Sequence, residues 1–196
     1  MRIVSGKWAG VSLVSPGSRV RPTRESVRVA WLSELEPELA GARVLDLFAG
    51  TGALGLEALS RGARSIDFVE NGKPSLHSLK ANIAKLRVTN RVRLFKKDVF
   101  QFLSTLETHA RDDRIGANNS SSGSGFPYAV VLADPPYTSR AADRLVTLWL
   151  ERPFSGILSV EHAPDRSLPG KGKRKQFQDS AISIYRSRKR QPGDRS

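Results

Sequence analysis

The sequence of 196 residues lacks cysteine, contains only three histidines and has no long apolar run. Because cysteine is missing, disulfides and thiolate metal sites are excluded, and the scattered histidines show no ligand spacing, so we expect no metal. No apolar run approaches the roughly 20 residues that a membrane-spanning helix requires, and the N-terminus lacks the apolar segment of a signal peptide. These absences predict a cytoplasmic protein that does not contact a membrane, and we expect a monomer.

The charge of the chain is strongly positive and is concentrated at its two ends. The formal net charge is +13, of which residues 1–30 carry +5 and residues 162–196 carry +7, so the middle is nearly neutral. Lysine and arginine gain affinity for nucleic acid because neutralising phosphates releases condensed counterions. The distribution therefore favours a nucleic-acid partner over the alternative of a solubilising or disordered basic tail.

Residues 1–36 form the first predicted unit, a hairpin followed by a helix. Short β-prone runs at residues 2–5 and 11–14 flank a glycine-bracketed turn. Thr23 is a good N-cap for the helix, which carries an apolar stripe at Val27, Trp31 and Leu35. The stripe places Trp31 in the core, whereas Trp8 in the turn can equally be a core residue or a base-stacking ring.

Residues 37–186 alternate between strands and helices and form the second predicted unit. Buried apolar runs predict strands at residues 43–48, 65–69, 91–95, 129–132, 156–160 and 181–185. Helices are expected at residues 54–59, from Pro74, at 100–106 and through Leu145, Leu148 and Trp149. This alternation predicts an α/β fold with a parallel, doubly wound sheet. The composition of residues 108–127 predicts a flexible loop, and residues 187–196 form a basic tail.

A glycine-rich turn follows the first predicted strand. Residues 50–55 read Gly-Thr-Gly-Ala-Leu-Gly, which matches G-x-G-x-x-G between a strand and a helix. Glycine lets a ligand approach the backbone closely, and the helix N-terminus favours a negative group. Glu70, at the end of the next strand, can bind a ribose in either of two enzyme classes. The turn by itself therefore does not separate NAD from S-adenosylmethionine.

Acidic residues recur near the ends of the predicted strands. Asp46 lies inside the first strand, where a carboxylate suits an ammonium or sulfonium charge better than a pyrophosphate. Asp98 follows the third strand, where it could accept a hydrogen bond from an adenine amine, and Asp134 ends the fourth. Because open α/β folds bind ligands at the carboxyl ends of their strands, we expect these carboxylates to form one site. They favour S-adenosylmethionine over NAD.

The fourth strand ends in the sequence Asp134-Pro135-Pro136-Tyr137. The two prolines fix their φ angles and donate no backbone hydrogen bonds, so a carbonyl beside Asp134 is held in place and left free. The cluster therefore offers two acceptors and a stacking ring to a planar group that bears an amine.

Here the sequence resembles a known family. Residues 46–52 and 134–137 resemble the amino-methyltransferases that use S-adenosylmethionine, and the chain as a whole resembles the RsmD family. That family methylates N2 of one guanine in 16S ribosomal RNA within the bacterial small ribosomal subunit. The supporting stretches are residues 2–10, 21–23 with 27–28, 52–62 and 179–186. The resemblance implies a Rossmann-like class I methyltransferase with an antiparallel last strand and a small N-terminal β-hairpin extension that faces RNA.

The resemblance also implies roles for individual residues. The catalytic set is Asp134 and the Pro135 carbonyl, which would accept hydrogen bonds from the amine, and Tyr137, which would stack on the target base. Glu70 would bind the ribose hydroxyls and Asp98 the adenine amine. The residues expected to bind S-adenosylmethionine are Asp46, Phe48, Ala49, Gly50, Gly52, Glu70, Asn71, Asp98, Val99 and Asp134.

Basic residues near the two ends are the candidate phosphate contacts. They are Arg2, Lys7, Arg21, Arg24, Arg28, Lys171, Lys173 and Arg174, each of which could equally be a solvated surface charge. The chain departs from the family pattern in its long 108–127 loop, its basic tail and the Val-Ala-Trp-Leu sequence of residues 29–32. These departures affect RNA docking rather than the chemistry.

Other functions share parts of this pattern. Asp-Pro-Pro-Tyr also serves methylation of adenine N6 in DNA or RNA, and the same amide-orienting chemistry serves protein glutamine methylation. An NAD-dependent oxidoreductase would leave residues 134–137 unexplained. A non-catalytic RNA-binding assembly factor with this fold is the alternative outside the enzymes.

Overall fold

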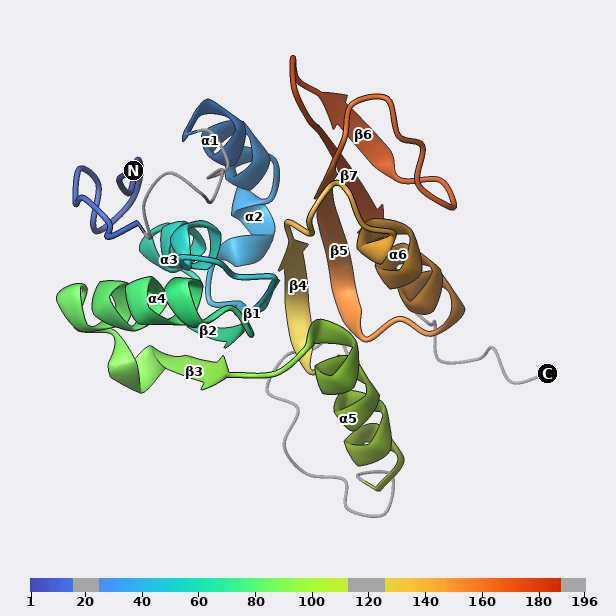
Figure 1. Ribbon diagram of the computed structural model, residues 1–196, viewed down its shortest axis with the longest axis horizontal. Helices are drawn as coiled ribbons and strands as arrows, with labels where there is room; N and C mark the ends of the chain where they lie inside the picture. The colour runs from blue at the N-terminus through green and yellow to red at the C-terminus, as the bar shows by residue number, and fades with distance from the viewer. Residues whose placement is uncertain (16–24, 113–125, 188–196) are drawn as a thin grey trace.

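The computed structural model describes residues 1–15, 25–112 and 126–187. Its centre is a seven-stranded sheet in the order β3-β2-β1-β4-β5-β7-β6 (Figure 1). The first five strands in that order are parallel to one another. The strand β7 runs antiparallel to both of its neighbours, β5 and β6. The strands are β1 (Arg43–Leu47), β2 (Ser65–Val69), β3 (Val92–Phe95), β4 (Tyr128–Ala133), β5 (Ser155–His162), β6 (Lys173–Gln176) and β7 (Ala181–Arg186).

Helices cover both faces of this sheet. One face packs against α1 (Glu25–Glu34), α2 (Glu36–Leu39), α3 (Ala53–Ser60) and α4 (Lys73–Lys85). The other face packs against α5 (Val99–Asp112) and α6 (Ala141–Glu151). The chain turns from one half of the sheet to the other between β1 and β4, which is the position where doubly wound folds bind ligands. The predicted Rossmann-like α/β fold with an antiparallel last strand is confirmed.

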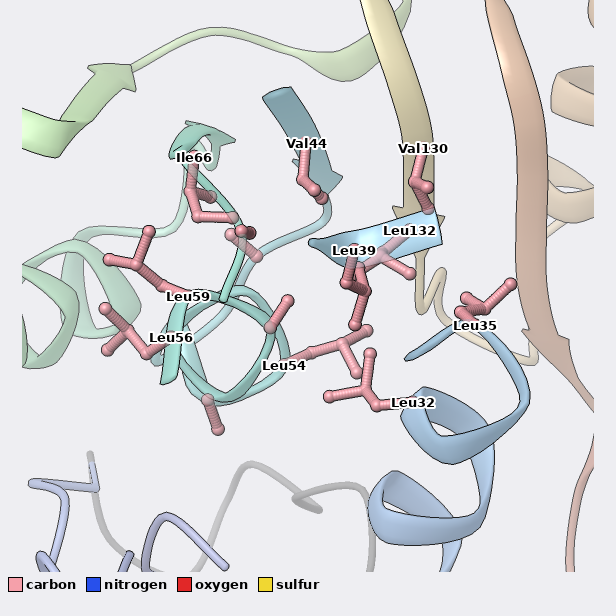
Figure 2. Close-up of a cluster of buried hydrophobic side chains, with 14 of the residues drawn as sticks. Leu32, Leu35, Leu39, Val44, Leu54, Leu56, Leu59, Ile66, Val130 and Leu132 are labelled. Atoms are coloured by element: carbon pink, nitrogen blue, oxygen red, sulfur yellow. The ribbon is translucent and has the colours of Figure 1, made fainter. Parts of the chain in front are cut away.

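The hydrophobic core explains why the strands read as continuous apolar runs. Successive residues of a strand point to opposite faces, and both faces here are covered. Val44 of β1 therefore joins the core beneath α1 to α4, while Leu45 joins the core beneath α5 and α6. Figure 2 shows the first of these cores, in which leucines of α1, α2 and α3 meet β1, β2 and β4.

The N-terminal segment is tied to the sheet domain by backbone hydrogen bonds. The two arms of the predicted hairpin meet at one antiparallel bridge between Arg2 and Ser12, and backbone N–H groups of Ile3 and Leu13 donate across it. The backbone N–H groups of Val4 and Ser5 each donate to the Glu57 carboxylate at 2.8 Å. Trp31 is fully buried and its Nε1 donates to Ser159 Oγ at 2.6 Å, so it is the core residue that the apolar stripe predicted.

Three elements differ from the expectations. The run of basic residues near 171–175 contains a strand, β6, which pairs with β7. A short helix, α2, follows α1 and was not among the expected helices. The helix α5 continues to Asp112, so the predicted loop at 108–127 begins in a helix. Residues 113–125 and the tail from 188 lie outside the described residues.

Among the described residues, no helix combines the length and the apolar character that crossing a bilayer would require.

Candidate active site at the carboxyl ends of the strands

Two adjoining cavities lie at the carboxyl ends of the central strands. The larger has a volume of about 650 Å³ and the smaller about 230 Å³. They share the wall formed by Phe48, Gly50, Asp134 and Pro136. The larger cavity extends from Asp46 towards α1 and the turn between β6 and β7, and the smaller one extends towards Glu70 and Asp98. The acidic residues expected at one edge of the sheet are thus brought together.

The glycine-rich turn between β1 and α3 has no room for side chains at two positions. A Cβ atom at Gly52 would lie 2.3 Å from Leu79 Cδ1, and the φ angle of Gly52 is +79°. A Cβ atom at Gly55 would lie 2.5 Å from Phe68 Cε1 and 2.8 Å from Asp46 Oδ2. Glycine is therefore required here by backbone conformation and by close packing.

Asp46 lies under this turn and is 1 % exposed. The backbone N–H of Gly55 donates to its Oδ2 at 2.9 Å. The pKa of Asp46 is raised to about 8, mainly by burial and also by the charges of Asp134 and Glu70, while the Gly55 hydrogen bond opposes the rise. A buried carboxyl group among other carboxylates is stabilised in its charged form by a cation, so this end of the larger cavity suits a positively charged ligand.

The smaller cavity is lined by Glu70, Asn71, Asp98 and Val99, which follow β2 and β3. The Glu70 carboxylate accepts hydrogen bonds from the backbone N–H groups of Gly50 at 2.7 Å and Gly72 at 2.6 Å. These bonds hold Glu70 against the glycine-rich turn. Asp98 Oδ1 accepts from the backbone N–H of Phe100 at 2.9 Å and so caps α5.

The sequence Asp134-Pro135-Pro136-Tyr137 forms one wall of the larger cavity. The Tyr137 hydroxyl donates to Glu161 Oε1 at 2.7 Å. Burial raises the pKa of Tyr137, and the bond to Glu161 raises it further, so this phenol stays protonated at neutral pH. The Tyr137 ring is therefore held by the backbone at one end and by the hydrogen bond to Glu161 at the other.

Glu161 lines the same cavity, and it is a residue that the sequence-based site did not include. It is 4 % exposed and lies in β5, the strand beside β4. The available signal was its position, because Glu161 directly follows an apolar run, as Glu70 does. The sequence does not say that β5 lies beside β4, and that neighbourhood places Glu161 near Asp134.

Comparison with known proteins identifies the family. The family described as conserved hypothetical protein 95 matches residues 1–174. Ribosomal RNA small subunit methyltransferase D of Escherichia coli is 31% identical over 175 residues, which cover 86% of this chain and 78% of that protein. This chain belongs to the RsmD family.

Further members and solved structures agree with this placement. The Bacillus subtilis protein YlbH is 32% identical to this RsmD-family chain, with 86% of each chain covered. The solved structure of a hypothetical protein from Thermus thermophilus has a TM-score of 0.78 and 27% identity, and the match covers 95% of this chain and 99% of that one. The structural similarity thus covers more of the chain than the residues that the family description matches.

The candidate phosphate contacts of this RsmD-family chain need one correction. Arg28 was expected to contact RNA, but its side chain is 0 % exposed and pairs with Glu57 at 3.4 Å. It also donates to the backbone carbonyl of Arg2 at 2.5 Å. Arg28 is therefore a structural link between α1, α3 and the N-terminal segment, because a buried guanidinium needs such partners.

The remaining candidate phosphate contacts lie on the surface or outside the described residues. Arg2 pairs with Glu25, Lys173 pairs with Glu34, and Arg174 donates to the Pro164 carbonyl. Lys7 is exposed, with its Nζ 5.3 Å from the centre of the Trp8 ring. Lys171 is exposed as well. Residues 16–24, which include Arg21 and Arg24, lie outside the described residues.

Proposed function

We propose that this protein transfers a methyl group from S-adenosylmethionine to the N2 amine of a guanine in small-subunit (16S) ribosomal RNA. Proteins named ribosomal RNA small subunit methyltransferase D are its relatives over most of their length. The cofactor class and the fold follow from the family. What we propose beyond the family is that the target atom is guanine N2 and that the substrate is the small ribosomal subunit.

The two cavities suit the two ends of S-adenosylmethionine. When bound, S-adenosylmethionine supplies an activated methyl group on a positively charged sulfur. Glu70 and Asp98 would hold the adenosine end in the smaller cavity, where both acids lie. Asp46 and the turn from Phe48 to Gly52 would hold the methionine end, and the absence of a side chain at Gly55 leaves room for Asp46 beneath the turn. The buried Asp46 would match the cationic charge of the ligand.

Asp134 lines both cavities and therefore stands between the cofactor and the substrate. Its carboxylate and the Pro135 carbonyl would accept the two hydrogens of the amine, which turns the nitrogen lone pair towards the methyl group. Methyl transfer would form the N–C bond as the C–S bond breaks, and the electron pair of the C–S bond would stay on the sulfur. The nitrogen then loses a proton to Asp134 or to water. Positioning and electrostatics supply most of the acceleration, because the methyl donor is already activated.

Tyr137 would form the stacking surface for the target base. Tyr137 lines the larger cavity, and the hydrogen bond from its hydroxyl to Glu161 restricts the movement of its ring. A base inside an RNA helix does not expose its amine to such a cavity, so the nucleotide must leave its stack. A ring that is already fixed accepts the base with little loss of conformational freedom.

The RNA itself would be held by the basic ends of the chain. Arg2, Lys7, Lys171, Lys173 and Arg174 are the described candidates, and Arg21 and Arg24 complete the set. Charge on both ends is compatible with an RNA that spans the mouth of the larger cavity, which reaches Met1 at one end of the chain and Asp179 near the other. Phosphate contacts of this kind position the RNA without reading its sequence.

The observation that carries this proposal is the location of Asp134 in the wall shared by both cavities. Replacing Asp134 by alanine should abolish methyl transfer to small subunits, while S-adenosylmethionine still binds in a calorimetric titration. The matched control is Asp165→Ala, because Asp165 is exposed and absent from both cavity walls. Full activity of Asp134→Ala would contradict the proposal. Cofactor binding without turnover by the unaltered protein on any ribosomal substrate would favour an assembly factor.

A further inference from the structure

One carboxylate oxygen of Glu161 accepts a hydrogen bond and the other does not. Oε1 accepts the hydrogen bond of the Tyr137 hydroxyl at 2.7 Å. Oε2 is buried and has no hydrogen-bond partner among the described residues. Glu161 is one of the residues that line the larger cavity. An acceptor that is removed from water and left unpaired is costly, so a ligand that brings a donor to this oxygen is favoured.

The sheet register places this oxygen beside the amine-binding residue. Ala133 of β4 pairs with Val160 of β5, so Asp134 and Glu161 each follow a paired position on neighbouring parallel strands. Because side chains alternate between faces along each strand, the residues that follow a paired position on two parallel strands point to the same face of the sheet. Trp31 of α1 packs on that face, where its Nε1 contacts Ser159, two residues before Glu161. Two acidic groups thus line one side of the cavity.

Guanine differs from the other RNA bases in having a hydrogen-bond donor on the ring nitrogen next to its exocyclic amine. In guanine, the N2 amine is adjacent to the ring N1–H, which is a donor. In adenine the N6 amine is adjacent to N1, and in cytosine the N4 amine is adjacent to N3, and both ring nitrogens carry lone pairs. Uracil has no exocyclic amine. An acceptor placed beside the amine site therefore distinguishes guanine from the other bases.

We propose that Glu161 is the residue that selects guanine, with Oε2 accepting the N1–H while Asp134 and the Pro135 carbonyl hold the N2 amine. This inference rests on the proposed function, and it names the contact by which the same site recognises its base. Adenine or cytosine in that position would bring a lone pair against the carboxylate. A polar site that loses its partner discriminates strongly against the wrong ligand. The Tyr137 hydroxyl, bonded to Oε1, fixes which oxygen faces the base.

The test compares guanine with 2-aminopurine, which keeps the N2 amine and lacks the N1–H. Each is placed at the target position of the ribosomal RNA substrate that the unaltered protein methylates. The ratio of kcat/KM for guanine to kcat/KM for 2-aminopurine is measured for the unaltered protein and for Glu161→Ala. Because the two purines differ in intrinsic reactivity by the same factor for both proteins, the change in the ratio isolates the N1–H contact.

The expected result is that Glu161→Ala lowers this ratio on the order of tenfold to a hundredfold. A loss of Tyr137 positioning alone would slow both substrates alike and leave the ratio unchanged, and Tyr137→Phe measures that effect separately. Glu151→Gln, at an exposed position on α6, is the matched control. If Glu161→Ala does not fold, Glu161→Met, which keeps the side-chain length, is measured in the same way.

An equal ratio in the unaltered protein and in the folded Glu161 variant would overturn the role of Glu161. Failure of the proposed function gives a different result, because the unaltered protein would then form no N2-methylguanosine at all. The two failures are therefore distinguishable in one set of reactions.

Discussion

Replacing Asp46 by asparagine should remove a proton that the folded protein holds and the unfolded chain does not. Asparagine has nearly the same shape and keeps an oxygen that can accept the hydrogen bond of the Gly55 N–H, which now reaches Asp46 Oδ2 at 2.9 Å. The variant therefore changes the charge of the site with little change in packing. Asp46 is 1 % exposed, so its protonation depends on the folded environment.

The sign and size of the effect follow from the raised pKa. Burial moves the pKa of Asp46 from 3.8 to about 8 in the folded protein. Between these values the folded state binds one proton more than the unfolded state, so the free energy of unfolding falls as pH rises. The slope approaches about 1.4 kcal/mol per pH unit and vanishes above the folded pKa. Asp46→Asn lacks this contribution.

Urea unfolding of both proteins at a series of pH values from about 5 to about 9 measures the effect. The difference in unfolding free energy between the unaltered protein and Asp46→Asn should fall steadily with pH and level off near the top of the range. Parallel curves would refute the reasoning, because Asp46 would then be ionised in the folded protein. Binding of S-adenosylmethionine near neutral pH should also release close to one proton, measured by calorimetry in two buffers.

Other changes test the support around the site. Glu57→Ala should lower the free energy of unfolding by roughly 3–5 kcal/mol, because the buried Arg28 loses its carboxylate partner and the N–H groups of Val4 and Ser5 lose their acceptor. Gly55→Ala should lower it by about 1–3 kcal/mol and weaken cofactor binding, since the new Cβ would crowd Phe68 and Asp46. Lys171→Glu should weaken RNA binding and reduce its salt dependence, because Lys171 would no longer neutralise a phosphate.

Each of these three predictions would be contradicted by a specific result. An unfolding free energy of Glu57→Ala equal to that of the unaltered protein would mean that Arg28 is not held by Glu57. Normal stability together with normal cofactor affinity in Gly55→Ala would show that the turn above Asp46 has spare room. An unchanged salt slope in Lys171→Glu would remove that residue from the RNA-facing surface.

The sequence predicted the parallel strands well, because each is buried on both faces and reads as an apolar run. The sequence also predicted that Asp46, Glu70, Asp98 and Asp134 meet at one edge of the sheet, because Asp46 lies near the carboxyl end of its strand and the other three follow theirs. The edge strand β6 was not predicted because all its residues are exposed, so no apolar pattern marks it. Its pairing with β7 is a tertiary property.

Two residues show what the sequence does not contain. Arg28 looked like a surface charge among other arginines, and its burial depends on Glu57, which lies on α3. Glu161 looked like the end of one more strand, and its position in the cavity depends on β5 lying beside β4. Both follow from strand order and helix packing, which local periodicity does not determine.

The most direct test of the central claim offers labelled S-adenosylmethionine to the protein with unmodified small subunits, naked ribosomal RNA or DNA. The RNA or DNA is then digested, and the labelled nucleoside is identified. Label in N2-methylguanosine from ribosomal RNA of the small subunit is the predicted result. Label in N6-methyladenosine or in DNA, or no transfer to any of these substrates, would contradict it.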